Sequence, residues 1–160
     1  MSGYVIYIFI FFILFGFVFS SILEYLNSKN WNDSIPEVLK DFYKENDYKR
    51  AKNYKIDRDK VSLISSLLST SITILFIVSG FYGKISDYSI YYFDSLFIQS
   101  ATFFLFFLII STTISLPISY YSVFTVEEKY GFNKTTKITF LKDKIKGLLI
   151  SLIIGGFILY

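Results

Sequence analysis

Ser115–Gly147 reads S-L-P-I-S-Y-Y-S-V-F-T-V-E-E-K-Y-G-F-N-K-T-T-K-I-T-F-L-K-D-K-I-K-G and lies between two long apolar segments of the chain. Pro117 lacks a backbone donor, so we expect it to kink the end of the preceding helix. Gly131 suits the left-handed conformation that closes many helices. Thr135 or Thr136 can cap a following helix with its hydroxyl. This polar stretch therefore predicts the end of one helix, a sharp turn and the start of another.

The overall composition is that of a membrane protein. Of 160 residues, 53% are hydrophobic and 21% are aromatic. The apolar residues gather in blocks close to the roughly 20 residues that cross a bilayer as a helix, and a helix satisfies its own backbone in lipid. We expect an all-α, polytopic membrane protein with about four transmembrane helices. The expected spans are residues 4–26, 61–82, 96–116 and 147–160.

The first and last spans leave alternatives open. No Lys or Arg precedes residues 4–26, and their apolar run exceeds the about 7–15 residues of a signal peptide, so a retained span is favoured over a cleaved one. Residues 147–160 reach only about 21 Å as a helix, against a hydrocarbon core of about 30 Å. We therefore expect an incomplete fourth span. Either the chain ends inside the membrane or, as we favour, it is the front part of a larger protein.

Residues 27–60 form a polar loop with nine Lys/Arg and seven Asp/Glu. Ser34 and Glu37 have the spacing of a capping box. A short amphipathic helix is predicted by three apolar residues at helical spacing: Ile35, Leu39 and Phe42. Such a helix fits the membrane surface or, equally, solvent. Residues 47–60 predict a second helix that leads into the next span, and residues 83–95 predict a short loop.

The spans themselves favour packing over transport. Small, weakly polar residues recur every three or four positions in two of them. One set is Ser62, Ser66, Ser69 or Thr70, and Thr73, and the other is Gly147, Ser151 and Gly155. This pattern is typical of helix packing in lipid, and a substrate path along it is the weaker alternative. No Asp, Glu, Lys or Arg lies near the middle of a span. That argues against a proton relay or an ion pathway, which need ionisable groups at depth.

The basic residues are distributed very unevenly between the loops. Residues 27–60 hold nine of the sixteen Lys/Arg, residues 120–146 hold six, and only one lies between the second and third spans. Basic loops stay on the cytoplasmic side of a membrane. We therefore expect both basic loops to be cytoplasmic and the N-terminus to be outside. Nothing else in the chain supports nucleic acid as a partner.

The polar stretch contains the unusual run E-E-K-Y-G-F-N-K-T-T, from Glu127 to Thr136. Leu116-Pro117 precedes this run, and it is followed by Phe140, Asp143 and Lys146. Residues 36–60 add looser matches, among them Tyr54, Asp57 and Lys60. The pattern resembles the N-terminal membrane region of the CAAX prenyl protease 1 family, which are integral-membrane zinc endopeptidases. One departure is Asp59-Lys60-Val61-Ser62, where the family pattern has Phe in place of Val61.

The resemblance implies a structural or domain-docking role for one set of residues. These are Pro117, Glu127, Glu128, Lys129, Gly131, Phe132, Asn133, Lys134, Thr136 and Asp143. Phe132 lies between polar neighbours and is expected to pack on another part of the protein. Glu127 and Glu128 are adjacent, so they point about 100° apart on a helix and make a poor acid–base pair. A hydrogen-bonding role in the turn is the stronger interpretation, with simple solvation or bridging to a nearby lysine as the alternative.

The chain contains no His and no Cys. A zinc peptidase of this type needs H-E-x-x-H, two imidazoles one helical turn apart with a Glu that activates water. Carboxylates alone do not replace the nitrogen and sulfur ligands of zinc. We therefore predict no catalytic and no metal-binding residue in this chain. The family's zinc would belong to a catalytic domain of the same or an adjacent gene product.

Three functions follow from these observations. The first is the N-terminal membrane portion of a CAAX prenyl protease-like zinc metalloendopeptidase, inactive alone, which helps to enclose a lipidated or membrane-associated peptide. The second is a non-enzymatic membrane scaffold or interaction protein, favoured by the small-residue faces and the missing His. The third, a small transporter or channel, is disfavoured because no ionisable group lies at depth.

Overall fold

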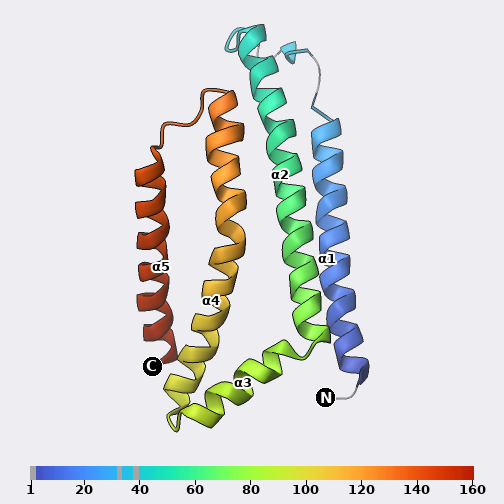
Figure 1. The fold of residues 1–160 in the computed structure, drawn as a ribbon. Helices are drawn as coiled ribbons and strands as arrows, with labels where there is room; N and C mark the ends of the chain where they lie inside the picture. The colour runs from blue at the N-terminus through green and yellow to red at the C-terminus, as the bar shows by residue number, and fades with distance from the viewer. Residues whose placement is uncertain (1–2, 32–33, 38–39) are drawn as a thin grey trace. The chain divides into compact units, whose positions relative to one another are not determined.

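A computed structural model of the chain describes residues 3–31, 34–37 and 40–160 (Figure 1). In these residues the secondary structure is helical, with no strand. The α-helices of the described chain are α1 (Gly3–Lys29), α2 (Glu45–Val78), α3 (Phe81–Tyr92), α4 (Leu96–Tyr121) and α5 (Lys137–Leu159), and α4 continues into a π-helical segment, η2 (Ser122–Glu127). The all-α prediction is confirmed.

Three of the helices are long and apolar enough to cross a membrane. They are α1, α2 and the continuous helix Leu96–Glu127. Few side chains of the described residues are buried within the chain: Tyr48, Val126, Phe140 and Ser89. On α1, the rings of Phe11, Phe15 and Phe19 stack along the outside of the helix at centroid distances of 6.1 and 5.9 Å. Such outward-facing rings fit a lipid environment, and a fourth span at residues 147–160 stays a prediction.

The structure divides into two compact units. The first contains α1, α2 and the segment Tyr120–Asn133, and the second contains Ser79–Ser119 and Lys134–Tyr160. In the first unit α1 lies alongside α2 (Figure 1). Trp31, just after α1, is attached to α2 by Lys52, whose Nζ donates to the carbonyl of Trp31 at 3.0 Å.

The polar first half of α2 explains why this long helix begins before the apolar stretch. Glu45 and Asp47 lie in its first turn, where negative charge complements the helix dipole. Ion pairs one turn apart add support, for example Lys49–Glu45 at 2.7 Å and Lys55–Asp59 at 2.8 Å. The prediction of a helix over residues 47–60 that leads into the next span is confirmed.

Two local predictions differ from the structure. Of the described residues in the predicted amphipathic helix, 34–36 and 40–44 are not helical and Glu37 lies in a 3₁₀ turn, whereas Leu39 lies outside the described residues. Phe42 is 79% exposed, so no packed apolar face holds a helix there. The predicted loop at residues 83–95 is largely the helix α3. Gly80 has a φ of 66°, which turns the chain after Val78 and starts a separate helix where a longer second span was expected.

In the second unit α3 packs against α4. The rings of Tyr82 and Phe107 stack at 4.7 Å, and Phe81 contacts Phe106 at 6.1 Å. An apolar cavity of about 630 Å³ lies between α4 and α5. The small residues of α5 line one wall of this cavity, notably Ser151, Gly155 and Gly156.

Candidate functional site

The run from Glu127 to Asn133 forms a tightly closed helix end. The backbone N–H of Phe132 donates to the carbonyl of Glu127 at 2.9 Å, and that of Gly131 donates to the carbonyl of Glu128 at 3.0 Å. Gly131 has a φ of 69°, the left-handed conformation that this pair of bonds requires. The geometry is that of a Schellman motif, and the prediction that Gly131 closes the helix is confirmed.

A side-chain hydrogen bond also stabilises this turn. The amide of Asn133 donates to Glu128 Oε2 at 2.7 Å. Through this bond one of the two adjacent glutamates takes part in the turn with its side chain. Glu127 contributes through its backbone carbonyl, which accepts from the N–H groups of Tyr130, Phe132 and Asn133.

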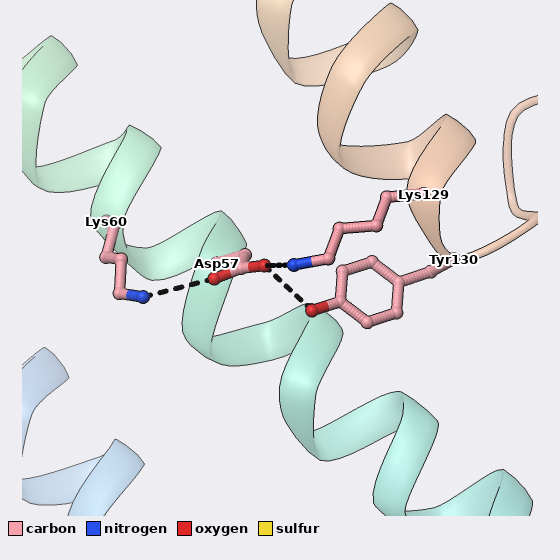
Figure 2. Close-up of polar contacts among 4 residues, drawn as sticks. All are labelled: Asp57, Lys60, Lys129 and Tyr130. Atoms are coloured by element: carbon pink, nitrogen blue, oxygen red, sulfur yellow. Dashed lines mark hydrogen bonds and ion pairs between the residues drawn. The ribbon is translucent and has the colours of Figure 1, made fainter.

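Within the first unit, the carboxylate of Asp57 on α2 binds two side chains of this turn. Lys129 Nζ lies 2.6 Å from Asp57 Oδ2, and the hydroxyl of Tyr130 donates to the same oxygen at 2.7 Å (Figure 2). Lys60, on α2 itself, donates to Asp57 Oδ1 at 3.1 Å. Both oxygens of one carboxylate are therefore occupied by three donors, two of which come from the turn. We call Asp57, Lys60, Lys129 and Tyr130 the Asp57 junction.

The electrostatics of the Asp57 junction favour a pair that is charged over the neutral pH range. Asp57 precedes the apolar part of α2, which begins at Val61, and its side chain is 22% exposed. The hydrogen bonds from Lys129, then Tyr130, then Lys60 hold the pKa of Asp57 well below its usual range. Asp57 in turn raises the pKa of Lys129. Asp57 is thus an ionised anchor and a poor candidate for a general acid.

Aromatic contacts extend the junction along α2. The rings of Phe132 and Tyr54 meet edge to face at 4.8 Å, and Tyr54 also contacts Tyr130 at 5.7 Å. The guanidinium of Arg50 lies 5.2 Å from the Phe132 ring centroid, within cation–π range. The prediction that Phe132 packs on another part of the protein is confirmed, and that part is the polar first half of α2.

The comparison with known proteins agrees with this geometry. Residues 24–160 match the family described as CAAX prenyl protease N-terminal, five membrane helices. The chain belongs to this family. It is 31% identical over 155 residues to CAAX prenyl protease 1 of Saccharomyces cerevisiae and 32% identical over 167 residues to the CAAX prenyl protease 1 homologue of Dictyostelium discoideum.

A solved member of the family has the same fold. The crystal structure of S. mikatae Ste24p matches 97% of this chain with a TM-score of 0.85 and 33% sequence identity. The matched part is only 38% of that protein. Likewise, the chain covers 34% of the yeast relative and 38% of the Dictyostelium relative, with 90% and 97% of its own length matched. This chain therefore corresponds to somewhat more than a third of a CAAX prenyl protease 1.

The zinc of the family does not fit the residues of this chain. His and Cys are absent from the sequence. Within residues 3–31, 34–37 and 40–160, no three His, Cys, Asp or Glu side chains gather in a way that could hold a metal ion. The Asp57 junction, with one carboxylate that already accepts from two ammonium groups and a phenol, offers no free ligand set.

The other residues of the family pattern lie in the second unit. Pro117 is inside α4, which continues past it to Tyr121. Thr136 is the N-cap of α5, where its hydroxyl accepts from the backbone N–H of Thr139 at 3.1 Å. Of the two threonines proposed as caps, Thr136 is thus the one that caps. Lys134 and Asp143 are exposed, and their proposed docking role stays a prediction.

Sequence reasoning did not find the partner of Lys129. Asp57 and Tyr130 belong to the resemblance, but the sequence alone gives neither of them a role. The two ends of the contact are 72 positions apart, and no local pattern relates such distant residues. The available signal was that both matched segments belong to the same family pattern, one in each predicted cytoplasmic loop.

Proposed function

We propose that this chain is the N-terminal membrane part of a CAAX prenyl protease 1-type zinc metalloendopeptidase and that its zinc site is carried by polypeptide outside these 160 residues. The single observation that carries the proposal is the Asp57 junction. It couples the family's motif to α2 through a charge-assisted hydrogen bond of 2.6 Å from Lys129 and a phenolic hydrogen bond of 2.7 Å from Tyr130. A chain with no His has no catalytic use for such a motif, so a supporting role is the better account.

The supporting role is to present the turn to the catalytic part. The Schellman motif and Asn133 fix the backbone of the turn, and α2 fixes its position in the first unit. Glu128 and Lys129 remain exposed at its surface, with Lys129 62% exposed while bound to Asp57. Such fixed, exposed charges are suited to orient a partner domain by electrostatic complementarity.

We infer a cytoplasmic location for this surface. Both segments that meet at the Asp57 junction belong to the loops that hold fifteen of the sixteen Lys/Arg. The N-terminus would then lie outside. The membrane helices would enclose part of a chamber for a lipidated or membrane-associated peptide, in keeping with the name CAAX prenyl protease that the relatives carry.

Affinity purification of the tagged chain from its native membrane in mild detergent tests the proposal. We expect a second polypeptide with H-E-x-x-H to copurify, or the same motif to follow in one longer product. The preparation that contains it should bind zinc and cleave a prenylated C-terminal peptide, whereas the 160-residue chain alone should do neither. Asp57→Asn should weaken the association, whereas Asp47→Asn, an exposed carboxylate at the start of α2, should not.

The alternative function makes the opposite prediction in the same experiment. A stable chain with no zinc-bearing partner, no zinc and no proteolysis would identify a non-enzymatic membrane scaffold. The absence of His from the sequence is the observation that favours this alternative.

A further inference from the structure

Helix α3 is too short to cross a membrane. Its twelve residues, Phe81–Tyr92, reach only about 18 Å at 1.5 Å per residue, against a hydrocarbon core of about 30 Å. It also carries two exposed charged residues, Lys84 and Asp87. An ionisable side chain is costly in hydrocarbon but not at the boundary with water. The composition of α3 thus differs from that of the long apolar helices.

The contacts of α3 fix where it lies relative to α4. Its first residues pack on the middle of α4, through Phe81 and Tyr82 against Phe106 and Phe107. Ser89, near its other end, is 1% exposed. Figure 1 shows α3 running obliquely to α4, so that its last residues come close to the first turn of α4.

The short connection to α4 holds the C-terminal end of α3 close to the N-terminal end of α4. Only three residues, 93–95, join the two helices, and these span at most about 11 Å. Gln99 Nε2 donates to the carbonyl of Phe93 at 2.6 Å, which ties this connection to α4. The continuous helix Leu96–Glu127 has 32 residues, about 48 Å at 1.5 Å per residue, which is longer than the hydrocarbon core. If this helix crosses the bilayer, its first turn and the end of α3 lie together at or beyond the edge of the core on the side where the helix enters.

Three tyrosines gather at this end of α3. Tyr88, Tyr91 and Tyr92 are all exposed, with Tyr91 82% exposed. Their rings contact one another, with centroids 4.6 Å apart for Tyr88 and Tyr92 and 5.0 Å apart for Tyr91 and Tyr92. Tyr and Trp concentrate at the membrane interface, because the ring prefers an apolar environment and the hydroxyl prefers water.

We propose that Tyr88, Tyr91 and Tyr92 form a tyrosine anchor that holds the end of α3 in the headgroup region of the bilayer. The lipid headgroups would accept from the phenol hydroxyls, and the rings would lie against the upper part of the acyl chains. Helix α3 would then be an interfacial helix that enters the bilayer only at its Phe81 end. The proposal rests on α4 crossing the membrane and is independent of any proteolytic activity.

Depth measurement with single cysteines tests the tyrosine anchor, and the chain has no native Cys to interfere. Tyr91→Cys, labelled with a fluorophore, is compared in lipid bilayers that carry a nitroxide either near the headgroup or near the acyl-chain end. Ile109→Cys, an exposed position near the middle of α4, is the deep control. Lys49→Cys, in the charged first half of α2, is the control for water.

The tyrosine anchor predicts severalfold stronger quenching of the Tyr91 probe by the headgroup nitroxide than by the deep nitroxide. The Ile109 probe should show the reverse. Equal quenching of the Tyr91 and Lys49 probes by iodide in water, with little by either nitroxide, would overturn the proposal by placing α3 in solvent. Stronger quenching by the deep nitroxide would overturn it by placing α3 in the core. Tyr88→Cys and Tyr92→Cys repeat the measurement if Tyr91→Cys fails to fold.

Discussion

Lys129, two residues beyond the end of η2, and Asp57 on α2 are joined by an ion pair of 2.6 Å, although 72 positions separate them in the chain. This contact and the Tyr130 hydroxyl attach the family's motif to the first half of α2. The contact joins two segments that are expected on the same side of the membrane. Substitutions at Asp57 and Lys129 therefore test directly how this contact stabilises the first unit.

Asp57→Asn should destabilise the first unit. The amide is close in shape to the carboxylate but has no charge, so it pairs weakly with Lys129 and Lys60. Because Lys129 is well exposed, solvent screens the pair and we expect a loss of only a few degrees in Tm in detergent. Lys129→Met should cost a similar amount, and the double variant should cost clearly less than the sum. Asp47 lies 3.9 Å from the guanidinium of Arg50 and is the control. If Asp47→Asn lowered Tm as much as Asp57→Asn, the Asp57–Lys129 pair would not be a specific source of stability.

The stability contributed by the Asp57 junction should not change over the neutral pH range. The pKa of Asp57 is lowered, so its contribution is fully present above the ordinary Asp pKa of about 4 and is lost as pH falls below it. The pKa of Lys129 is raised, so its contribution persists up to the ordinary Lys pKa of about 10 and is lost above it. The difference in Tm between the wild type and Asp57→Asn should stay level from about pH 5 to about pH 9. A difference that disappears near pH 6 would contradict this assignment.

Gly131→Ala should destabilise the turn by about 1–2 kcal/mol, because Ala pays that cost in the left-handed conformation. No neighbouring atom lies within 4 Å of the position that the new Cβ would take, so backbone conformation is the cause and not a clash. Gly147→Ala is the matched control: it too meets no atom within 4 Å, but it lies in the helix α5. There Ala should be neutral or stabilising by roughly 0.5–1 kcal/mol. Thermal unfolding followed by circular dichroism separates the two.

Thr136→Ala should shorten α5 at its start. The hydroxyl that accepts from the N–H of Thr139 is lost, at a typical cost of about 1 kcal/mol for an N-cap. Thr136→Ser keeps the hydroxyl and should restore most of the stability. Hydrogen exchange of the first-turn amides of α5 provides the measurement. Equal protection in the Ala and Ser variants would show that another group caps the helix.

The proposed orientation predicts which positions an impermeant thiol reagent reaches. Single cysteines at Lys49 and Lys134 should be protected in sealed vesicles with the outside face exposed, and a cysteine at Asp94 should react. These positions sample the two basic loops and the connection between α3 and α4. Vesicles of the opposite orientation should give the reverse pattern. Labelling of Lys134→Cys together with Asp94→Cys from one side would contradict the orientation.

The features that could be predicted from the sequence are those that depend on local chemistry. The sequence places Gly131 at a helix end because few other residues adopt a positive φ. It offers Thr136 as one of two caps because a hydroxyl can replace a missing backbone acceptor. The apolar blocks identified the class of protein for the same reason: a bilayer requires long apolar helices.

The features that could not be predicted depend on contacts between distant residues or on breaks hidden in an apolar run. The apolar run continues through Gly80 to Tyr82, so hydropathy alone extended the second span past the point where α2 ends at Val78. Asp57 was one of seven acidic residues in its loop, and only the folded first unit shows that Lys129 and Tyr130 approach it.

The scarcity of buried side chains in the described residues has a thermodynamic consequence. Lipid or detergent already covers the outward-facing rings of α1, so separating the helices exposes little new apolar surface to water. The heat-capacity change of unfolding, about 12–15 cal/mol/K per residue in water-soluble proteins, arises from such exposure and should be far smaller here. The stability of this chain should therefore vary almost linearly with temperature, with neither the pronounced curvature nor the cold denaturation of a soluble domain of the same length.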